Sequence, residues 1–263
     1  MQAVFFTTEN CFKILQKIFR FTDTMAPRFY IDTELSANKA LVLPEKAAHH
    51  ASRVLRMREG DSALLFDGKG NEAEVIMHFS ASQTEAEIIS IKKSSTESPL
   101  KSTLIQSLVS QEKLDWILEK ATELGVTKIV IVPAERSVTK LDAKRLQKRL
   151  TQWKGTVLSA CEQCGRAVLP EVLYYEDLKK ALIENKSLTN LVLAPTATQG
   201  FSLDKTESIT FAVGPEGGFN TQEIELAKQM GYESALLGPR VLRTETAGLA
   251  ALAVAQCLAG DFR

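Results

Sequence analysis

Two loops rich in glycine and proline near the C-terminus are the segments of this chain best suited to chemistry. The first glycine loop, residues 214–219, has the sequence GPEGGF, and the second glycine loop, residues 237–247, has the sequence LGPRVLRTETA. Glycine and proline leave backbone N–H and C=O groups accessible, because no bulky side chain intervenes. Two such loops side by side can bind a flat, polar ligand through main-chain hydrogen bonds.

Each glycine loop follows a short apolar run and precedes a helical pattern. Residues 209–213 predict a buried strand, and residues 235–237 predict a second one. Asn220 and Glu223 have the spacing of a capping box, so a helix is expected directly after the first glycine loop. Residues 245–259, rich in Ala and Leu, predict a buried helix. This order predicts an α/β sheet with ligand loops at the carboxyl ends of its strands.

The two glycine loops match no common nucleotide motif. The first lacks the Lys-Ser/Thr pair of a P-loop, and no G-x-G-x-x-G follows a strand. Either loop alone is equally well explained as a tight turn. Together they resemble the cofactor loops of SPOUT methyltransferases, specifically the 16S ribosomal RNA uridine-N3 methyltransferase family. The resemblance begins near Arg28 and includes residues 119–126 (EKATELGV), 135–137 (ERS) and 160–166 (ACEQCGR).

The resemblance implies a fold, a reaction and partners. It implies a SPOUT domain over residues 100–263, with a mostly parallel sheet and a deep trefoil knot, preceded by a PUA-like RNA-binding β-barrel over residues 25–95. Such a knot is a rare exception to unknotted topology. The implied cofactor is S-adenosylmethionine, and the implied substrate is N3 of a specific uridine in 16S ribosomal RNA of the small subunit. The family further implies a homodimer in which two subunits complete the site. The absence of a signal sequence or membrane span in the sequence suggests the cytoplasm, unless residues 1–24 are an organelle address.

Methyl transfer to uridine N3 defines what the site residues must do. The nucleophile must be aligned with the methyl group, and the N3 proton must leave. A carboxylate can accept the proton, and an arginine can stabilise charge on the uracil oxygens. Substrate-side candidates are Arg136, Glu162 and Arg166, with Glu245 either a site carboxylate or a helix-start acid favoured by the helix dipole. Implied cofactor-binding residues are Ala194, Pro195, Gly214, Glu216, Gly217, Gly218, Leu237, Gly238, Leu242, Arg243, Thr244 and Ala247.

Charge is distributed unevenly along a chain whose net charge is zero. Residues 136–166 carry eight Lys or Arg against two acids, a net charge of +6, whereas residues 200–235 carry two Lys against six acids, a net charge of −4. The basic run is either a solvated helix face or a phosphate-contacting surface, and the family resemblance favours the second. Candidate RNA-binding residues are Arg28, Arg53, Arg56, Arg58 and Arg240.

The segment from Arg28 to about residue 95 has a different pattern. Residues 63–66, 73–79 and 84–91 predict short strands, with a turn at residues 67–71. Residues 49–57 predict one helix. Residues 94–99 are small and polar and end in Pro99, so they predict a linker. These short strands predict a small β-barrel.

The remainder of the C-terminal half alternates strands and helices. Strands are predicted at residues 104–109, 128–132 and 191–194. Apolar residues at helical spacing predict a helix that Gly125 ends. The strand at residues 128–132 delivers Glu135 and Arg136 to its carboxyl end.

Residues 1–24 and the cysteines add little to the site. Residues 1–24 hold five of the twelve phenylalanines and predict an extension upstream of a functional start near Met25. Their apolar stretches are too short for a membrane span, and no secretory signal pattern is present. Cys161 and Cys164 form a C-x-x-C without the further ligands that zinc needs, so no metal is expected.

Two other functions fit the same fold. One is a non-catalytic RNA-binding or ribosome-assembly protein, against which the intact glycine loops argue. The other is an enzyme that modifies a different base or position, because pocket shape determines base choice. The second glycine loop and the EQCGR segment at residues 162–166 favour the uridine-N3 family.

Overall fold

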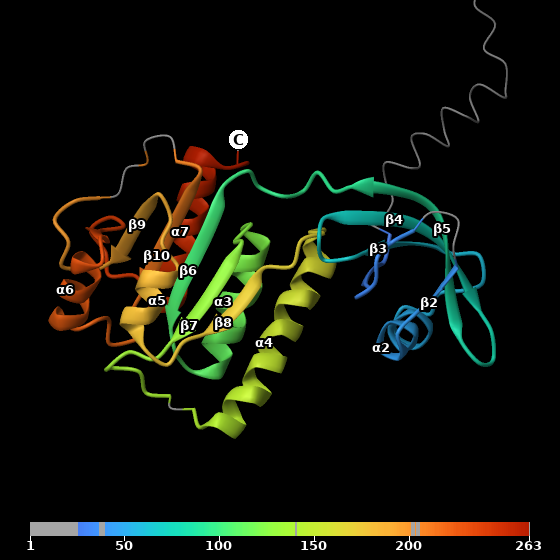
Figure 1. Cartoon of the computed structure of the whole chain (residues 1–263), viewed down its shortest axis with the longest axis horizontal. Helices are drawn as coiled ribbons and strands as arrows, with labels where there is room; N and C mark the ends of the chain where they lie inside the picture. The colour runs from blue at the N-terminus through green and yellow to red at the C-terminus, as the bar shows by residue number, and fades with distance from the viewer. Residues whose placement is uncertain (1–25, 37–39, 140, 201–202, 204–205, 263) are drawn as a thin grey trace, which may run out of the picture. The chain divides into compact units, whose positions relative to one another are not determined.

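The computed structural model describes residues 26–36, 40–139, 141–200, 203 and 206–262 (Figure 1). The predicted extension at residues 1–24 and the predicted start at Met25 lie outside the described residues. The chain divides into two units. Of the described residues, unit 1 contains those up to Phe66 together with Glu72–Lys92, and unit 2 contains Asp67–Asn71 and those from Lys93 onwards.

Unit 1 is built on a five-stranded sheet with the order β1-β3-β4-β5-β2. The β1–β3 pair is parallel, whereas β3–β4 and β2–β5 are antiparallel. Phe29, Leu65 and Met77 are fully buried in its core. The three predicted strands are confirmed, and two short strands are added to them. The strands are β1 (Arg28–Tyr30), β2 (Ala40–Val42), β3 (Ser62–Phe66), β4 (Asn71–Phe79) and β5 (Thr84–Lys93).

The helix of unit 1 differs from its prediction at both ends. Helix α2 (Glu45–His49) begins after Pro44 and continues as a π-helical turn, His50–Val54. The helix therefore ends before Met57, and the prediction of a helix to that residue is wrong. Arg56 has φ of 55°, a left-handed conformation that is uncommon for residues other than glycine.

Unit 2 is built on a six-stranded parallel sheet with the order β11-β9-β10-β6-β7-β8. This confirms the predicted α/β class and the parallel sheet. Figure 1 shows β10 beside β6, although β7, β8 and β9 lie between them in the sequence. The strands are β6 (Lys101–Ser107), β7 (Lys128–Val132), β8 (Glu171–Tyr174), β9 (Thr189–Leu193), β10 (Ser208–Val213) and β11 (Glu233–Ala235).

Helices cover both faces of this sheet, as its doubly buried strands require. Helix α3 packs against α4 and α7, and α5 packs against α6. Successive residues of β6 point to opposite faces, with Ile105 in the core formed with α5 and α6 and Leu104 directly beneath Gly248 of α7. The helices are α3 (Gln111–Glu123), α4 (Ala143–Cys164), α5 (Leu178–Glu184), α6 (Thr221–Gln229) and α7 (Thr244–Ala259).

Local signals for helix ends are confirmed in unit 2. Asn220 and Glu223 form the predicted capping box at the start of α6. Gly125 follows α3 with φ of 78°, which a side chain would disfavour.

The predicted linker at residues 94–99 joins β5 to β6 without forming a helix or strand, and its residues are held firmly by contacts within unit 2. The Glu97 carboxylate accepts hydrogen bonds from Arg166 and from the N–H groups of Ala167 and Val168. Ser98 is buried, and its hydroxyl donates to Gln256 Oε1 at 2.7 Å. These contacts anchor the start of the parallel sheet.

Candidate active site

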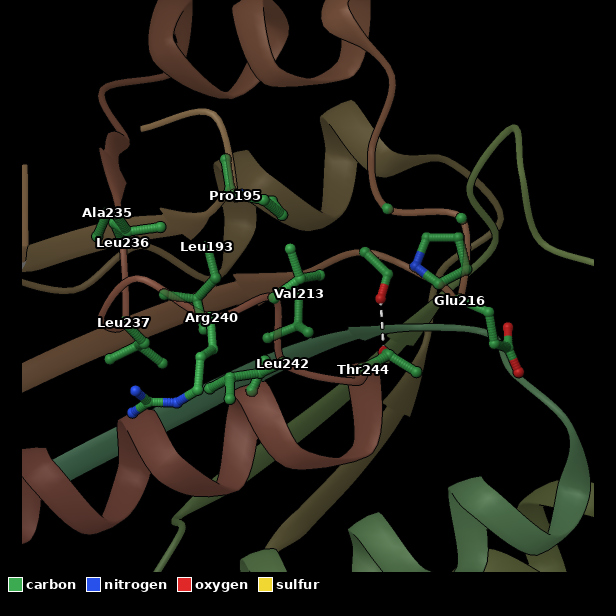
Figure 2. Close-up of a pocket in the computed structure, with 17 residues that line it drawn as sticks. Leu193, Pro195, Val213, Glu216, Ala235, Leu236, Leu237, Arg240, Leu242 and Thr244 are labelled. Atoms are coloured by element: carbon green, nitrogen blue, oxygen red, sulfur yellow. Dashed lines mark hydrogen bonds between the residues drawn. The ribbon is translucent and has the colours of Figure 1, made fainter. Parts of the chain in front are cut away.

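A pocket lies where the carboxyl ends of three adjacent strands, β9, β10 and β11, meet the start of α7 (Figure 2). Both glycine loops line it, as expected for loops that follow neighbouring parallel strands. All the predicted cofactor-binding residues except Gly238 and Arg243 are among its lining residues. The lining consists of Leu193, Ala194, Pro195, Val213, Gly214, Pro215, Glu216, Gly217, Gly218, Ala235, Leu236, Leu237, Arg240, Val241, Leu242, Thr244 and Ala247.

The first glycine loop folds tightly back on itself. A Cβ atom at Gly214 would lie 2.5 Å from the backbone N of Phe219, so a side chain there would displace the backbone. The N–H of Gly218 donates to the carbonyl of Pro215 at 2.9 Å, and Gly218 has φ of 66°. The loop shape therefore depends on glycine at two positions.

The start of α7 is joined to the first glycine loop. The Thr244 hydroxyl donates to the carbonyl oxygen of Gly214 at 2.6 Å, the contact shown by the dashed line in Figure 2. Thr244 is buried, so water does not compete for this hydrogen bond. One side chain of the second glycine loop thus fixes the position of the first.

The Glu216 carboxylate points away from the pocket, although its residue is part of the lining (Figure 2). It accepts a hydrogen bond from Lys113 Nζ at 3.1 Å. Burial opposes ionisation of this carboxyl, but hydrogen bonds from its own N–H, from Lys113 and from the N–H of Ser110 outweigh it and lower the pKa of Glu216. Lys113, on α3, was not singled out in the sequence because its partners lie far along the chain.

Arg136 contacts the first glycine loop. Its Nη1 donates to the carbonyl of Gly217 at 2.9 Å. The neighbouring Glu135 accepts a short hydrogen bond from Asn220 Nδ2, and its backbone N–H donates to Glu223 at 2.8 Å. The predicted delivery of Glu135 and Arg136 to a strand end is confirmed, and their partners belong to the first glycine loop and to the capping box of α6.

Glu245 lies beside the charged groups at the start of α7. Its side chain is 17% exposed, and its carboxylate oxygens lie 3.9 Å from Lys113 Nζ and 3.9 Å from Arg243 Nη1. Arg243 itself is 83% exposed and is outside the pocket lining. The structure therefore brings two of the predicted site residues, Glu216 and Glu245, together around Lys113.

Two other substrate-side candidates, Arg166 and Glu162, are not among the residues that line the pocket. Arg166 is buried, and its Nη1 donates to the carbonyls of Thr122 and Val126 while Nε and Nη2 donate to Glu97. These bonds favour a structural role for Arg166. Glu162 is half-buried near the end of α4.

The candidate RNA-binding arginines have different exposures. Arg28 is buried, forms a 2.7 Å ion pair with Glu72 and stacks over Phe66, and this burial disfavours the predicted contact with RNA. The exposed candidates are Arg53, Arg56, Arg58 and Arg240, and the last of these lines the pocket.

Neither a metal site nor a membrane span is present in the described part of the chain. Across the described ranges, no group of three His, Cys, Asp or Glu side chains is placed to hold a metal ion. Within the same ranges, no helix is long and apolar enough to cross a membrane.

Comparison with known proteins identifies the family. The profile of the RNA methyltransferase domain matches residues 96–256, and that of the RNA methyltransferase PUA domain matches residues 43–77. Ribosomal RNA small subunit methyltransferase E of Bacillus subtilis is 33% identical over 216 residues, covering 78% of this chain and 84% of the relative. The Buchnera aphidicola (Schizaphis graminum) protein of the same name is 34% identical over 245 residues, covering 90% and 98%.

Solved structures give the same result. The Neisseria gonorrhoeae ribosomal RNA small subunit methyltransferase E, bound to S-adenosylmethionine, matches with a TM-score of 0.84 and 40% identity over 90% of this chain and 100% of that chain. A Legionella pneumophila protein in complex with the same cofactor matches with a TM-score of 0.87 and 34% identity over 91% and 100%. This chain therefore belongs to the SPOUT family of RNA methyltransferases that includes the small-subunit ribosomal RNA methyltransferases E.

Proposed function

We propose that this protein transfers a methyl group from S-adenosylmethionine to N3 of a specific uridine in 16S ribosomal RNA of the small subunit. The observation that carries the proposal is that both glycine loops line one pocket. The names of the relatives support a ribosomal RNA substrate, and the cofactor-bound neighbours support S-adenosylmethionine. The family resemblance supports uridine N3 and the deep trefoil knot, and we propose that the protein acts in the cytoplasm.

The pocket fits the proposed cofactor chemically. Its walls include the apolar side chains of Leu193, Leu237 and Leu242, against which an adenine ring can pack. A Cβ atom at Gly218, which lines the pocket, would meet no heavy atom within 4 Å, so a ligand can approach the backbone there. When bound, S-adenosylmethionine supplies a methyl group on a positively charged sulfur. The other predicted cofactor-binding residues of the lining would hold S-adenosylmethionine mainly through their backbone N–H and C=O groups.

The charged residues beside the pocket would handle the uridine proton. We assign proton acceptance to the carboxylate of Glu245, which lies at the start of α7 beside Lys113 and Arg243. Exposed Arg243 would stabilise negative charge on the uracil oxygens, and Arg136 would keep the first glycine loop in place. Because N3 lies on the pairing edge, the uridine must be unpaired or flipped out.

Other surfaces would bind RNA and a second subunit. Exposed Arg53, Arg56 and Arg58 of the PUA-like unit, proposed to span residues 25–95, would contact phosphates. The SPOUT domain, proposed to span residues 100–263, exposes Val254 and Leu258 one turn apart on α7. This apolar stripe supports the proposed homodimer.

The test is transfer of labelled methyl from S-adenosylmethionine to small ribosomal subunits that lack the modification, followed by nucleoside analysis. A labelled 3-methyluridine peak is expected. Cofactor binding without that peak would point to another RNA position or to a non-catalytic RNA-binding protein. Absence of cofactor binding would contradict the assignment of the pocket.

A further inference from the structure

Gln106, at the carboxyl end of β6, lies directly behind the pocket. Its side chain is fully buried, and it is not among the residues that line the pocket. Its Nε2 donates to the Thr244 hydroxyl at 3.0 Å and to the Ser107 carbonyl at 3.1 Å. Gln106 was not identified from the sequence, because nothing near it in the chain indicates a partner in α7.

Two hydrogen bonds link Gln106 to Gly214 through Thr244, and each has a fixed direction. The Gly214 carbonyl can only accept, so the single hydroxyl proton of Thr244 is directed at it over 2.6 Å. The Thr244 oxygen can then only accept from its other neighbour, which requires the NH₂ group of Gln106 rather than its oxygen. Gln106, Thr244 and Gly214 therefore form one hydrogen-bond relay, in which each residue comes from a separate segment of the chain.

Close packing keeps this relay in place. A Cβ at Gly248 would lie 3.0 Å from Leu104 Cδ1 and 3.5 Å from Val213 Cγ2, so α7 lies directly on β6 and β10 one turn after Thr244. Neighbouring structure therefore leaves little space for α7 to move and restore a lost hydrogen bond. A change at Gln106 is transmitted to Thr244 and then to Gly214.

Gln106 does not have the contacts of a residue that serves stability alone. Its Oε1 is buried and has no hydrogen-bond partner within the described residues. A buried acceptor without a partner costs free energy that an apolar side chain of similar size would avoid. The donated hydrogen bond to Thr244 accounts for a glutamine here.

We propose that Gln106 is a positioning residue that holds the two glycine loops at the spacing needed to bind S-adenosylmethionine. The proposal rests on the proposed function of the pocket. The relay acts on cofactor affinity, whereas the RNA-binding surface of unit 1 contains none of its members.

Calorimetry with S-adenosylmethionine tests the proposal on five variants of the full chain. Gln106→Leu and Thr244→Val each remove one link and are expected to raise the Kd about tenfold, while the double variant is expected to be little weaker than either single one. Thr244→Ser keeps the hydroxyl and is expected to recover most of the affinity that Thr244→Val loses. Gln106→Glu is expected to bind more weakly than Gln106→Leu, because a carboxylate competes for the Thr244 proton.

Gln256 supplies the matched control. It is an equally buried glutamine near the other end of α7, where it accepts from Ser98 and donates to the carbonyl of Leu124 at 3.0 Å. Gln256→Leu is expected to lower the midpoint of thermal unfolding while leaving the Kd for S-adenosylmethionine within about twofold of wild type.

The outcomes separate the relay from the proposed function. Wild type that does not bind S-adenosylmethionine contradicts the proposed function. Wild type that binds while folded Gln106→Leu and Thr244→Val bind equally well overturns the relay alone. Equal loss of affinity in Gln256→Leu also overturns it, because the effect would then reflect general destabilisation.

Discussion

Arg136 donates a hydrogen bond of 2.9 Å from Nη1 to the carbonyl oxygen of Gly217, and the same side chain packs along that glycine. A Cβ at Gly217 would lie 3.2 Å from Arg136 Cδ, so the arginine stem fills the space beside the glycine. The loop after β7 thereby supports the first glycine loop, and Arg136 acts on the proposed reaction through the shape of the pocket.

Arg136→Ala is expected to raise the KM for S-adenosylmethionine about three- to tenfold, because it removes one hydrogen bond and the packing beside Gly217. Arg136→Lys is expected to recover part of this loss. Steady-state methylation assays measure both, with Lys180→Ala, an exposed cation of α5, as the control. An unchanged KM in Arg136→Ala would contradict the supporting role.

Arg243→Ala is expected to abolish methylation without unfolding the protein. The Arg243 side chain is 83% exposed, and its ion-pair distance to Glu245 is 3.9 Å, so its removal costs little stability. Methyl transfer and thermal unfolding are measured on the same preparation, and Lys228→Ala, another partly exposed paired cation, serves as the control. An active Arg243→Ala protein would show that the role is misassigned.

Glu97→Ala is expected to lower the free energy of unfolding by about 3 kcal/mol, because it leaves buried Arg166 without its carboxylate. Glu97 also accepts from the N–H groups of Ala167 and Val168. Urea unfolding measures the change. Glu225→Ala, which removes an exposed ion pair with Lys228, is expected to stay within about 0.5 kcal/mol of wild type. Equal effects of the two substitutions would argue against the structural role of Arg166.

Gly214→Ala is expected to abolish binding of S-adenosylmethionine, because the new Cβ would lie 2.5 Å from the backbone N of Phe219. Gly155→Ala in α4 is the matched glycine control, since a Cβ there would meet no heavy atom within 4 Å. Alanine is expected to stabilise that helix by about 0.5–1 kcal/mol. Calorimetry and urea unfolding distinguish the two effects, and normal cofactor binding by Gly214→Ala would sink the prediction.

Glu216→Gln is expected to reduce stability in a pH-dependent way. The pKa of Glu216 is lowered in the folded protein despite the opposing effect of burial, through its own N–H, Lys113 and Ser110. Its contribution is therefore complete above the usual value of 4.5 and is lost as the pH falls through the lower folded pKa. The difference in unfolding free energy between wild type and variant should shrink below about pH 4.5. A difference that is constant from pH 7 to the acid limit would refute the ionised pair with Lys113.

Local patterns in the sequence determined the elements and the position of the glycine loops. The capping box of Asn220 and Glu223 and the helix end at Gly125 depend on residues within one or two turns, so their patterns are sufficient. Short elements such as β8 and α5 were not predicted, because they carry few periodic residues.

The order of strands in space, and the contacts that depend on it, were decided by the tertiary structure. Placing β10 between β9 and β6 brings Gln106 beside Thr244, and the loop after β10 brings Glu216 to Lys113. Arg28 and Arg166 are buried, and each pairs with a carboxylate far away in the sequence, Glu72 and Glu97 respectively. Neighbouring residues in the sequence do not reveal these ion pairs.

Local residue patterns thus predict the fold class, the family resemblance and the two loops that form the pocket, because nearby residues set the backbone conformation. Which side chains face that pocket, and which hold its loops together, was decided only when strands distant in sequence were packed side by side. A hydrogen bond such as Thr244 to Gly214 depends on positions in space that no local pattern encodes.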